Sequence, residues 1–176
     1  TIHEVIDGAG VSWTGEYRFL RDDGGYADIL DRGTVLRDAD GRPLRMIGAM
    51  LDLTERKAQE RALRESELLF RTLFESIDEG FCVIEFLDGP HGPLSDFVHV
   101  MANPAYTTNA GIPDVVGQRM REMVPLEAEG WIEIYRRVLL SGEPLRFERE
   151  LEHTGRHLEL AALRIEPPER RQVAVL

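Results

Sequence analysis

A block of sequence that occurs twice constrains this 176-residue chain more than any other feature. In each block the end of a helix is followed by glycine and then by three strand-like runs that short turns separate. The matched positions are Tyr17 with Phe147, Gly25 with Gly155 and Leu30 with Leu160, each 130 residues apart, and Met46 with Val173, 127 residues apart. Self-similarity of this kind indicates a repeated structural unit. The sequence therefore predicts two copies of one domain, of which the first is truncated and the second lacks the end of its last strand.

Both blocks have the pattern of an antiparallel meander. In the first block, runs rich in β-favouring residues alternate with turn signals at 22–25 and 38–41. A helix end is predicted over residues 1–10, and a full helix over 127–140. The predicted strands are 16–21, 26–37 and 42–53 in the first block, and 79–87, 96–102, 145–153, 157–165 and 171–176 in the second.

Residues 54–77 form an uninterrupted stretch without glycine or proline between the two blocks. This stretch predicts a linker helix, roughly 36 Å long at 1.5 Å per residue. Thr54 is placed to cap its start, and Glu55 lies in the first turn, where the helix dipole favours an acidic side chain. The predicted division is the C-terminal half of a first domain over 1–53, the linker helix over 54–77, and a second domain over 78–176.

Apolar residues recur along the linker helix at heptad spacing. Leu63, Phe70 and Ile77 are seven residues apart, and Leu73 lies at an intermediate seam position. This is a weak coiled-coil seam that is polar at its start. It favours a parallel homodimer through the linker helix, with packing of the same face on the helix's own domain as the alternative.

The charge balance excludes several kinds of partner. The chain has 21 Lys and Arg against 32 Asp and Glu, a net charge of −11, whereas nucleic acids and anionic membranes attract basic surfaces. No apolar run approaches the roughly 20 residues of a membrane-spanning helix, and no signal-peptide pattern occurs. We therefore expect a cytoplasmic segment with no nucleic-acid or membrane contact, and membrane anchoring elsewhere in a longer parent chain stays open.

The sequence contains no catalytic or metal-binding constellation. Its five histidines lack the spacing of metal ligands on one element, and no nucleophile triad, phosphate loop or glycine-rich nucleotide motif occurs. Carboxylate pairs lie at hairpin turns, where they lack the burial that shifts the pKa of an acid–base catalyst. The single cysteine, Cys82, excludes an internal disulfide and is expected to be buried and structural. We expect no catalytic residue and no metal in this segment.

Particular residues now carry a family resemblance. The run EYRFLRDDGGYADILDRGTVLRDADGRPLRMIGAMLDLTERK resembles the C-terminal half of a PAS sensory domain, and its end, 52–56, resembles the Asp-Ile/Leu-Thr-Glu-Arg/Lys signature at the PAS exit. The run VHVMANPAYTTNAGIPDVVGQRMREMVP resembles the core of a following PAS domain, with 103–105 matching its Asn-Pro-Ala turn. The resemblance implies an α+β fold with a five-stranded antiparallel sheet and helices on one face, in two copies joined by the long helix. Because the sheet of the first copy is incomplete, we expect a symmetry mate, the linker helix or swapped elements to cover it.

The resemblance also implies a relay site. In PAS proteins the junction between the last strand and the exit helix is taken to pass signal from the sheet to the helix. Here that junction consists of Asp52, Leu53, Thr54 and Glu55.

A ligand pocket is implied between the sheet and the helices of the second copy, and its candidate residues are Asn103, Tyr106, Trp131 and Tyr135. Ordinary core packing of these aromatic residues is the alternative. Flavin-binding PAS domains carry a reactive cysteine in a Gly-x-Asn-Cys-Arg motif, but the matching region, 117–121, has none. Haem-binding PAS sensors place a ligating histidine on the long helix, which here has none. No cofactor is therefore identified, and an unknown small ligand stays open.

The expected function is that of a sensory module that receives a signal, dimerises and relays it to a downstream output domain of the same chain. Two runs, DFVHVMANPAY and WIEIYRRVLLSGEPLRFERELE, resemble PAS domains found upstream of histidine kinases. The resemblance thus implies a bacterial-type sensor histidine kinase of a two-component phosphorelay as the parent. The alternatives are input to a cyclic-dinucleotide synthase or phosphodiesterase, and a pure dimerisation module without ligand.

Overall fold

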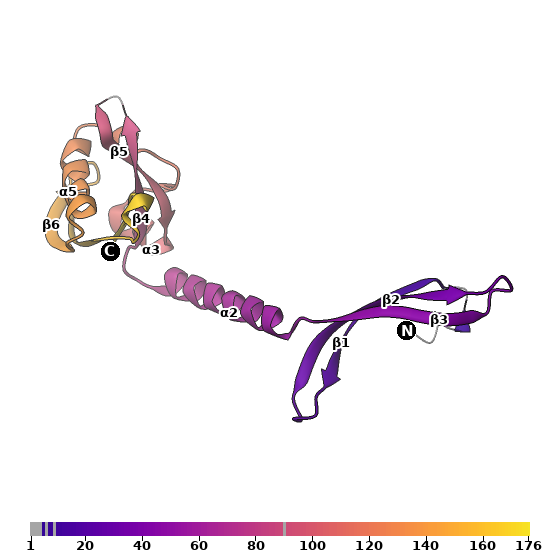
Figure 1. The fold of residues 1–176 in the computed structure, drawn as a ribbon. Helices are drawn as coiled ribbons and strands as arrows, with labels where there is room; N and C mark the ends of the chain where they lie inside the picture. Colours follow the sequence, from indigo (N-terminus) through magenta and orange to yellow (C-terminus); the bar gives the residue numbers. More distant parts are fainter. Residues whose placement is uncertain (1–4, 6, 9, 90) are drawn as a thin grey trace. The chain divides into compact units, whose positions relative to one another are not determined.

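The computed structural model describes residues 5, 7, 8, 10–89 and 91–176. The helix end expected over residues 1–10 falls largely outside these. The chain divides into two compact units, residues 1–69 and 70–176, here called unit 1 and unit 2 and each described by itself (Figure 1).

Unit 1 is built on three antiparallel strands in the order β1-β2-β3. They are β1 (Ser12–Leu20), β2 (Tyr26–Arg37) and β3 (Pro43–Asp52). The turns are closed by aspartate side chains, because Asp23 accepts from the N–H of Gly25 and Asp38 accepts from the N–H groups of Asp40 and Arg42. The predicted meander is therefore present, and its acidic pairs shape turns.

The register of unit 1 corrects the constant offset of 130 residues between the repeated blocks. Tyr17 pairs with Ile29, whereas its match Phe147 pairs with Leu160. Leu30 therefore lies on the opposite face from Tyr17, and it cannot correspond to Leu160 while Tyr17 corresponds to Phe147. The physical reason is that the β1–β2 connection is one residue longer than the β6–β7 connection of unit 2, and a shift of one residue exchanges the two faces of a strand.

One aromatic ring organises the middle of the unit 1 sheet. Trp13 stands opposite Gly33, and Gly33 stands opposite Gly48 on the next strand. The indole lies directly over both glycines, because a Cβ atom added at Gly33 would be 2.2 Å from Trp13 Cη2 and 2.7 Å from the carbonyl oxygen of Ile47. The two glycines are thus needed for the close approach of the ring to the backbone.

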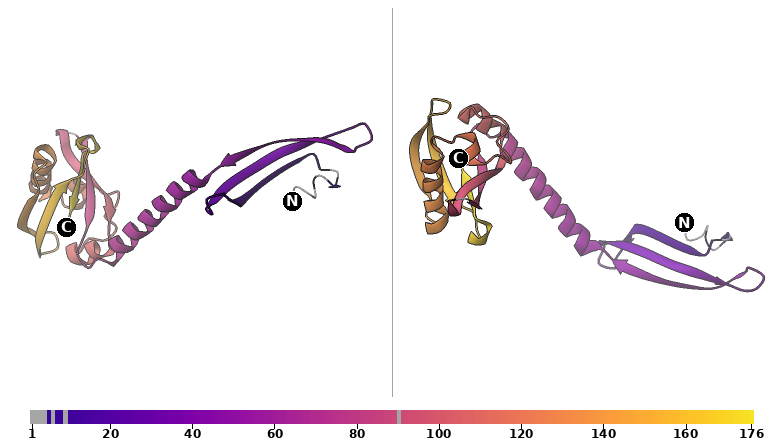
Figure 2. Two further views of the ribbon diagram at one scale, coloured as in Figure 1. Left: turned by 60° about the horizontal axis from the view of Figure 1, so that its bottom comes forward. Right: turned by 90° about the horizontal axis from the view of Figure 1, so that it is seen from above.

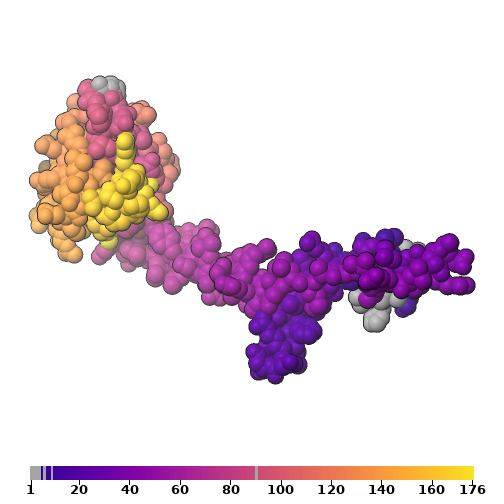
Figure 3. Space-filling view, viewed as in Figure 1, coloured from indigo at the N-terminus to yellow at the C-terminus, as the bar shows by residue number. Residues whose placement is uncertain are grey.

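The strand β3 lies at the surface of unit 1 along its whole length (Figure 3). It exposes Met46 and Met50 on one face of the sheet and Ile47 and Leu51 on the other. In unit 2 the last strand of the meander is central and buried instead. The expectation that another element covers the first sheet stays a prediction.

The linker helix is α2 (Thr54–Ser76). It ends one residue before the predicted boundary, although the N–H of Ile77 still donates to the carbonyl of Leu73 at 3.1 Å. None of the residues of α2, all of which the structure describes, is buried.

Unit 2 contains a five-stranded antiparallel sheet in the order β5-β4-β8-β7-β6, seen from two further sides in Figure 2. Its strands are β4 (Cys82–Gly89), β5 (Gly92–Ala102), β6 (Leu145–Leu151), β7 (Arg156–Arg164) and β8 (Gln172–Val175). Its helices are α3 (Pro104–Ala110), α4 (Met120–Met123), α5 (Ala128–Ser141) and the short 3₁₀ helix η1 (Pro168–Arg170). The α+β architecture implied by the resemblance is confirmed for this unit.

The core of unit 2 lies between this sheet and its helices. The helix α5 contributes Trp131, Ile132 and Tyr135, which cluster with Ile84 and Phe97 of the sheet. This face of α5 is the one that its apolar spacing predicts. Gly142 ends the helix with a φ of 74°, a conformation that favours glycine.

Candidate functional site

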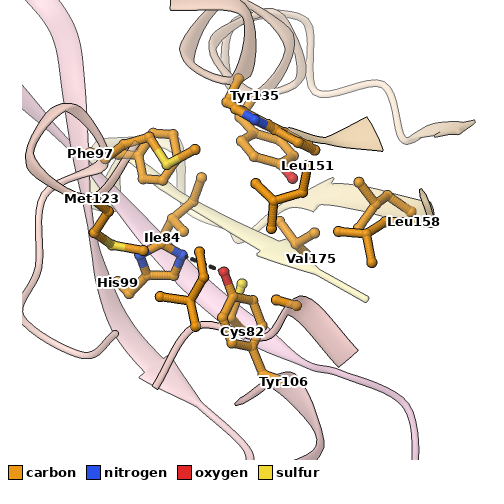
Figure 4. Close-up of a pocket in the computed structure, with 15 residues that line it drawn as sticks. Cys82, Ile84, Phe97, His99, Tyr106, Met123, Tyr135, Leu151, Leu158 and Val175 are labelled. Atoms are coloured by element: carbon orange, nitrogen blue, oxygen red, sulfur yellow. Dashed lines mark hydrogen bonds between the residues drawn. The ribbon is translucent and has the colours of Figure 1, made fainter. Parts of the chain in front are cut away.

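A small cavity lies inside the core of unit 2 (Figure 4). Its volume is about 50 Å³, far below the roughly 300–1,000 Å³ of drug-sized ligand pockets. Three of the predicted pocket residues, Tyr106, Trp131 and Tyr135, line it, together with Cys82 and His99. None of the lining residues that the structure describes is an Asp, Glu, Lys or Arg.

His99 and Tyr106 form the polar pair of this cavity. The Tyr106 hydroxyl lies 3.1 Å from His99 Nε2, and only 3% of the His99 side chain is exposed. Burial lowers the pKa of His99 to about 4, although the backbone carbonyl of Gln118 opposes this effect. Burial also raises the pKa of Tyr106. At neutral pH both groups are therefore uncharged.

The sequence offered a signal for His99 that motif searching passes over. Phe97 and His99 are two residues apart on β5, so both side chains point to the same face of the sheet. Phe97 is one of the most apolar residues of that strand, which marks this face as the buried one. His99 thus follows Phe97 into the core, where their rings are 5.7 Å apart.

Cys82 is a buried wall of the cavity. Its thiol is fully enclosed, and burial raises its pKa to about 12. Since the thiolate is the reactive form, this cysteine is chemically inert at neutral pH.

Asn103 is a correction to the predicted pocket, because it acts as a cap and a bridge and lies outside the described residues that line the cavity. Its Oδ1 accepts from the N–H groups of Tyr106 and Phe81, each at 2.9 Å. Its Nδ2 donates to the carbonyls of Glu79, at 2.9 Å, and Ile77, at 3.5 Å. The physical reason is that an Asn before Pro at the helix start turns its amide toward backbone groups.

Glu127 is a second buried polar residue that sequence reasoning missed. Its carboxylate accepts from the indole N–H of Trp131 at 2.9 Å and from the backbone N–H groups of Glu152 and His153. It thereby fastens the start of α5 to the β6–β7 turn. A buried carboxylate with three N–H donors is satisfied, so its role is structural.

The strand–helix junction of unit 1 is the other predicted site. The Thr54 hydroxyl accepts from the N–H of Asp28 at 2.9 Å, so it binds β2 and does not cap its own helix as predicted. The Asp52 carboxylate accepts from the N–H of Thr54 and pairs with Arg21 at 2.5 Å. Hydrogen bonds from Thr54, aided by Arg21, lower the pKa of Asp52. Leu53 is buried, and its N–H donates to the Asp28 carbonyl, which completes the connection to β2.

Two charged residues of α2 extend this junction. Lys57 pairs with Glu16 at 2.6 Å and lies 3.8 Å from Asp28, while Arg61 pairs with Asp28 at 2.8 Å. The hydrogen bond to Glu16 raises the pKa of Lys57. Since these pairs are largely exposed, each is worth little alone, and their combined effect is to fix the direction in which α2 leaves the sheet. The predicted junction residue Glu55 is exposed and lies 3.4 Å from the Gln59 side-chain amide.

The predicted helix seam is open to solvent in the single chain. Leu63, Phe70, Leu73 and Ile77 are all exposed, between 41% and 62%. Phe70 stacks on Phe74 at 5.6 Å between ring centroids.

Two further searches concern the described residues only. They contain no group of His, Cys, Asp and Glu side chains arranged to hold a metal ion. Within the same residues, no helix has the length and apolarity to cross a membrane.

The comparisons with known proteins follow. The family model of the PAS fold matches residues 1–50. No curated protein matches the chain. A solved sensory box histidine kinase/response regulator from Burkholderia thailandensis is 33% identical, with 41% of this chain and 54% of that chain covered and a TM-score of 0.33. This chain thus spans about half of that structure's length.

A second solved structure is a domain of the sensory box sensor histidine kinase/response regulator from Geobacter sulfurreducens. It is 21% identical, with 64% of this chain and 93% of that chain covered and a TM-score of 0.46. The match of the PAS family model coincides with the block in which the sequence showed the PAS exit signature. The chain therefore carries, over residues 1–50, the PAS fold of a sensory signalling protein, as its sequence predicted.

Proposed function

We propose that this chain is a sensory relay module in which unit 2 is a second PAS domain and α2 couples the two units. The observation that carries the proposal is the position of Asn103. One amide side chain holds both the helix that carries the cavity residue Tyr106 and the segment that follows α2.

The coupling has a short physical route within unit 2. Residues 77–81 connect the end of α2 to β4, and Asn103 binds backbone groups at three of these five positions. The segment is also held close to α3, because a Cβ atom at Gly80 would be 3.1 Å from Tyr106 Cα. A shift of the segment therefore displaces Tyr106 and its contact with His99. Since coupling between sites is reciprocal, a change in the cavity acts on the segment in the same measure.

The junction of unit 1 supplies the corresponding contacts at the other end of α2. Thr54, Lys57 and Arg61 tie the first two turns of the helix to β1 and β2. In the proposed relay, a rearrangement of the sheet changes these contacts and re-aims the helix. Switching of this kind requires two arrangements of similar energy, for which exposed ion pairs are suited.

The open seam of α2 supports a homodimer. Leu63, Phe70 and Leu73 present apolar surface that a second copy of the helix would bury. The output domain is proposed to be a histidine kinase, on the sequence resemblance given above. The ligand of the cavity, if the module senses one, enters at His99 and Tyr106.

The test compares two substitutions of Asn103 in the 176-residue chain. Asn103→Asp keeps the acceptor for Tyr106 and Phe81 but removes the donor to Glu79 and Ile77, whereas Asn103→Ala removes both. The readout is the change in amide chemical shifts of residues 70–81 when Tyr106→Phe removes the hydroxyl from the cavity.

We expect the wild-type chain to transmit the Tyr106→Phe change to residues 70–81, and both Asn103 variants to transmit less. Asn109→Ala is the matched control, since Asn109 donates to the Asp78 carbonyl at 3.2 Å from an exposed site on the same helix. Equal transmission in the wild type and in Asn103→Ala would show that Asn103 does not couple the two sites.

A further inference from the structure

The cavity of unit 2 contains a polar atom whose hydrogen-bonding capacity is unused. His99 Nε2 faces the Tyr106 hydroxyl, whereas His99 Nδ1 is buried and has no hydrogen-bond partner among the described residues. Figure 4 shows this second nitrogen on the side of Met123, whose thioether is only a weak acceptor. Leaving a buried polar atom unpaired is costly, which favours a bound group that pairs with it.

The size of the cavity limits what that group is. A volume of about 50 Å³ corresponds to roughly three to five water-sized positions. A flavin, a haem or a nucleotide is far larger. The occupant is therefore a molecule of a few non-hydrogen atoms.

The chemistry of the walls limits its charge. His99 and Tyr106 are both neutral at pH 7, and the other described lining residues are apolar or are neutral Cys, Trp and Tyr. An ion would lose its hydration without gaining a counter-charge, and the cost of such burial is large. The walls thus accept an apolar body with one polar group.

The tautomer of His99 defines that polar group. When the Tyr106 hydroxyl donates to Nε2, Nδ1 carries the ring proton and needs an acceptor. When Nε2 donates to Tyr106, Nδ1 needs a donor. A hydroxyl group serves both tautomers, and a carbonyl serves the first.

We propose that the cavity of unit 2 binds a small uncharged molecule with a short apolar body and one hydroxyl or carbonyl group, held by His99 Nδ1. The proposal rests on the proposed sensory function and names its ligand class. It predicts that a short alcohol binds more tightly than an apolar probe of similar size, and that a carboxylate of the same length is rejected.

The experiment titrates the 176-residue chain with 1-propanol, xenon and propionate while the ring nitrogens of His99 are followed by ¹⁵N NMR. We expect saturable binding of 1-propanol with a shift of the His99 Nδ1 resonance, xenon binding without that shift, and no binding of propionate. In His99→Phe, 1-propanol binding should weaken by roughly two- to tenfold, the effect of one net hydrogen bond, while xenon binding persists. Met123→Leu is the control, which alters the wall and should affect both probes alike.

Three results would overturn the proposal: no saturable 1-propanol binding, as when the cavity holds only water; the same response of His99 to xenon; or propionate binding as tightly as propanol. The wild-type spectra decide these points even if His99→Phe does not fold. Binding is measured at the cavity itself, so a failed relay through Asn103 would leave the ligand class standing. Conversely, absent binding would leave a relay through Asn103 intact.

Discussion

Replacing Thr54 by valine tests the junction between sheet and linker helix with almost no change in shape. The Thr54 hydroxyl is the acceptor, at 2.9 Å, for the N–H of Asp28 in a partly buried contact. Valine keeps the volume and removes the acceptor, so the N–H of Asp28 loses its partner. The expected cost is about 1–2 kcal/mol, since a net hydrogen bond is worth about 1 kcal/mol and an unsatisfied donor costs more.

The assay is amide hydrogen exchange at Asp28 and Leu53, read by NMR. Leu53 donates to the carbonyl of Asp28, so both amides report opening of the same connection. A loss of 1–2 kcal/mol corresponds to exchange that is faster by a factor of roughly 5–30. Because Thr54 also lowers the pKa of Asp52, the same substitution should raise that pKa toward its ordinary value.

Thr54→Ser is the matched control, because serine keeps the hydroxyl and removes only a methyl group. We expect Thr54→Ser to exchange at nearly the wild-type rate. If Thr54→Val also exchanged at that rate, or if the serine variant opened as readily as the valine variant, the hydroxyl would not hold the junction.

Three further outcomes are expected. Burial lowers the pKa of His99 from 6.5 to about 4, so between these values the unfolded chain binds a proton that the folded chain does not. The free energy of unfolding of unit 2 should therefore fall by roughly 3 kcal/mol as the pH drops from 6.5 to 4, and a pH series of His99→Phe should lack this component. Gly33→Ala should destabilise unit 1 by about 1–3 kcal/mol in native-state hydrogen exchange because its Cβ meets an indole ring, whereas Gly15→Ala, with open space around it, should not. Sedimentation should show a dimer that Leu73→Glu dissociates and that Leu68→Glu, exposed but off the seam, leaves intact; a wild-type monomer would contradict the seam.

Local signals in the sequence determined most of the elements. The turn residues at 22–25 and 38–41 set the meander because their aspartates accept from nearby backbone N–H groups. The stretch without glycine or proline set α2, and apolar spacing set the buried face of α5. The PAS resemblance needed only short motifs at the right spacing. Each of these is a property of neighbouring residues, which is why the sequence alone carries it.

Tertiary structure decided the functions of individual polar residues. Asn103 and Thr54 were both predicted to cap their own helices, but Asn103 also holds the linker, and Thr54 holds β2 instead. Glu127 and His99 entered the core through partners that lie 7 to 26 residues away in the chain. Side-chain spacing fixes which face a residue occupies, whereas its hydrogen-bond partner depends on which backbone groups other elements leave unpaired there. That second quantity exists only once the sheet and helices have packed, and here it turned a histidine without a motif into the centre of the cavity.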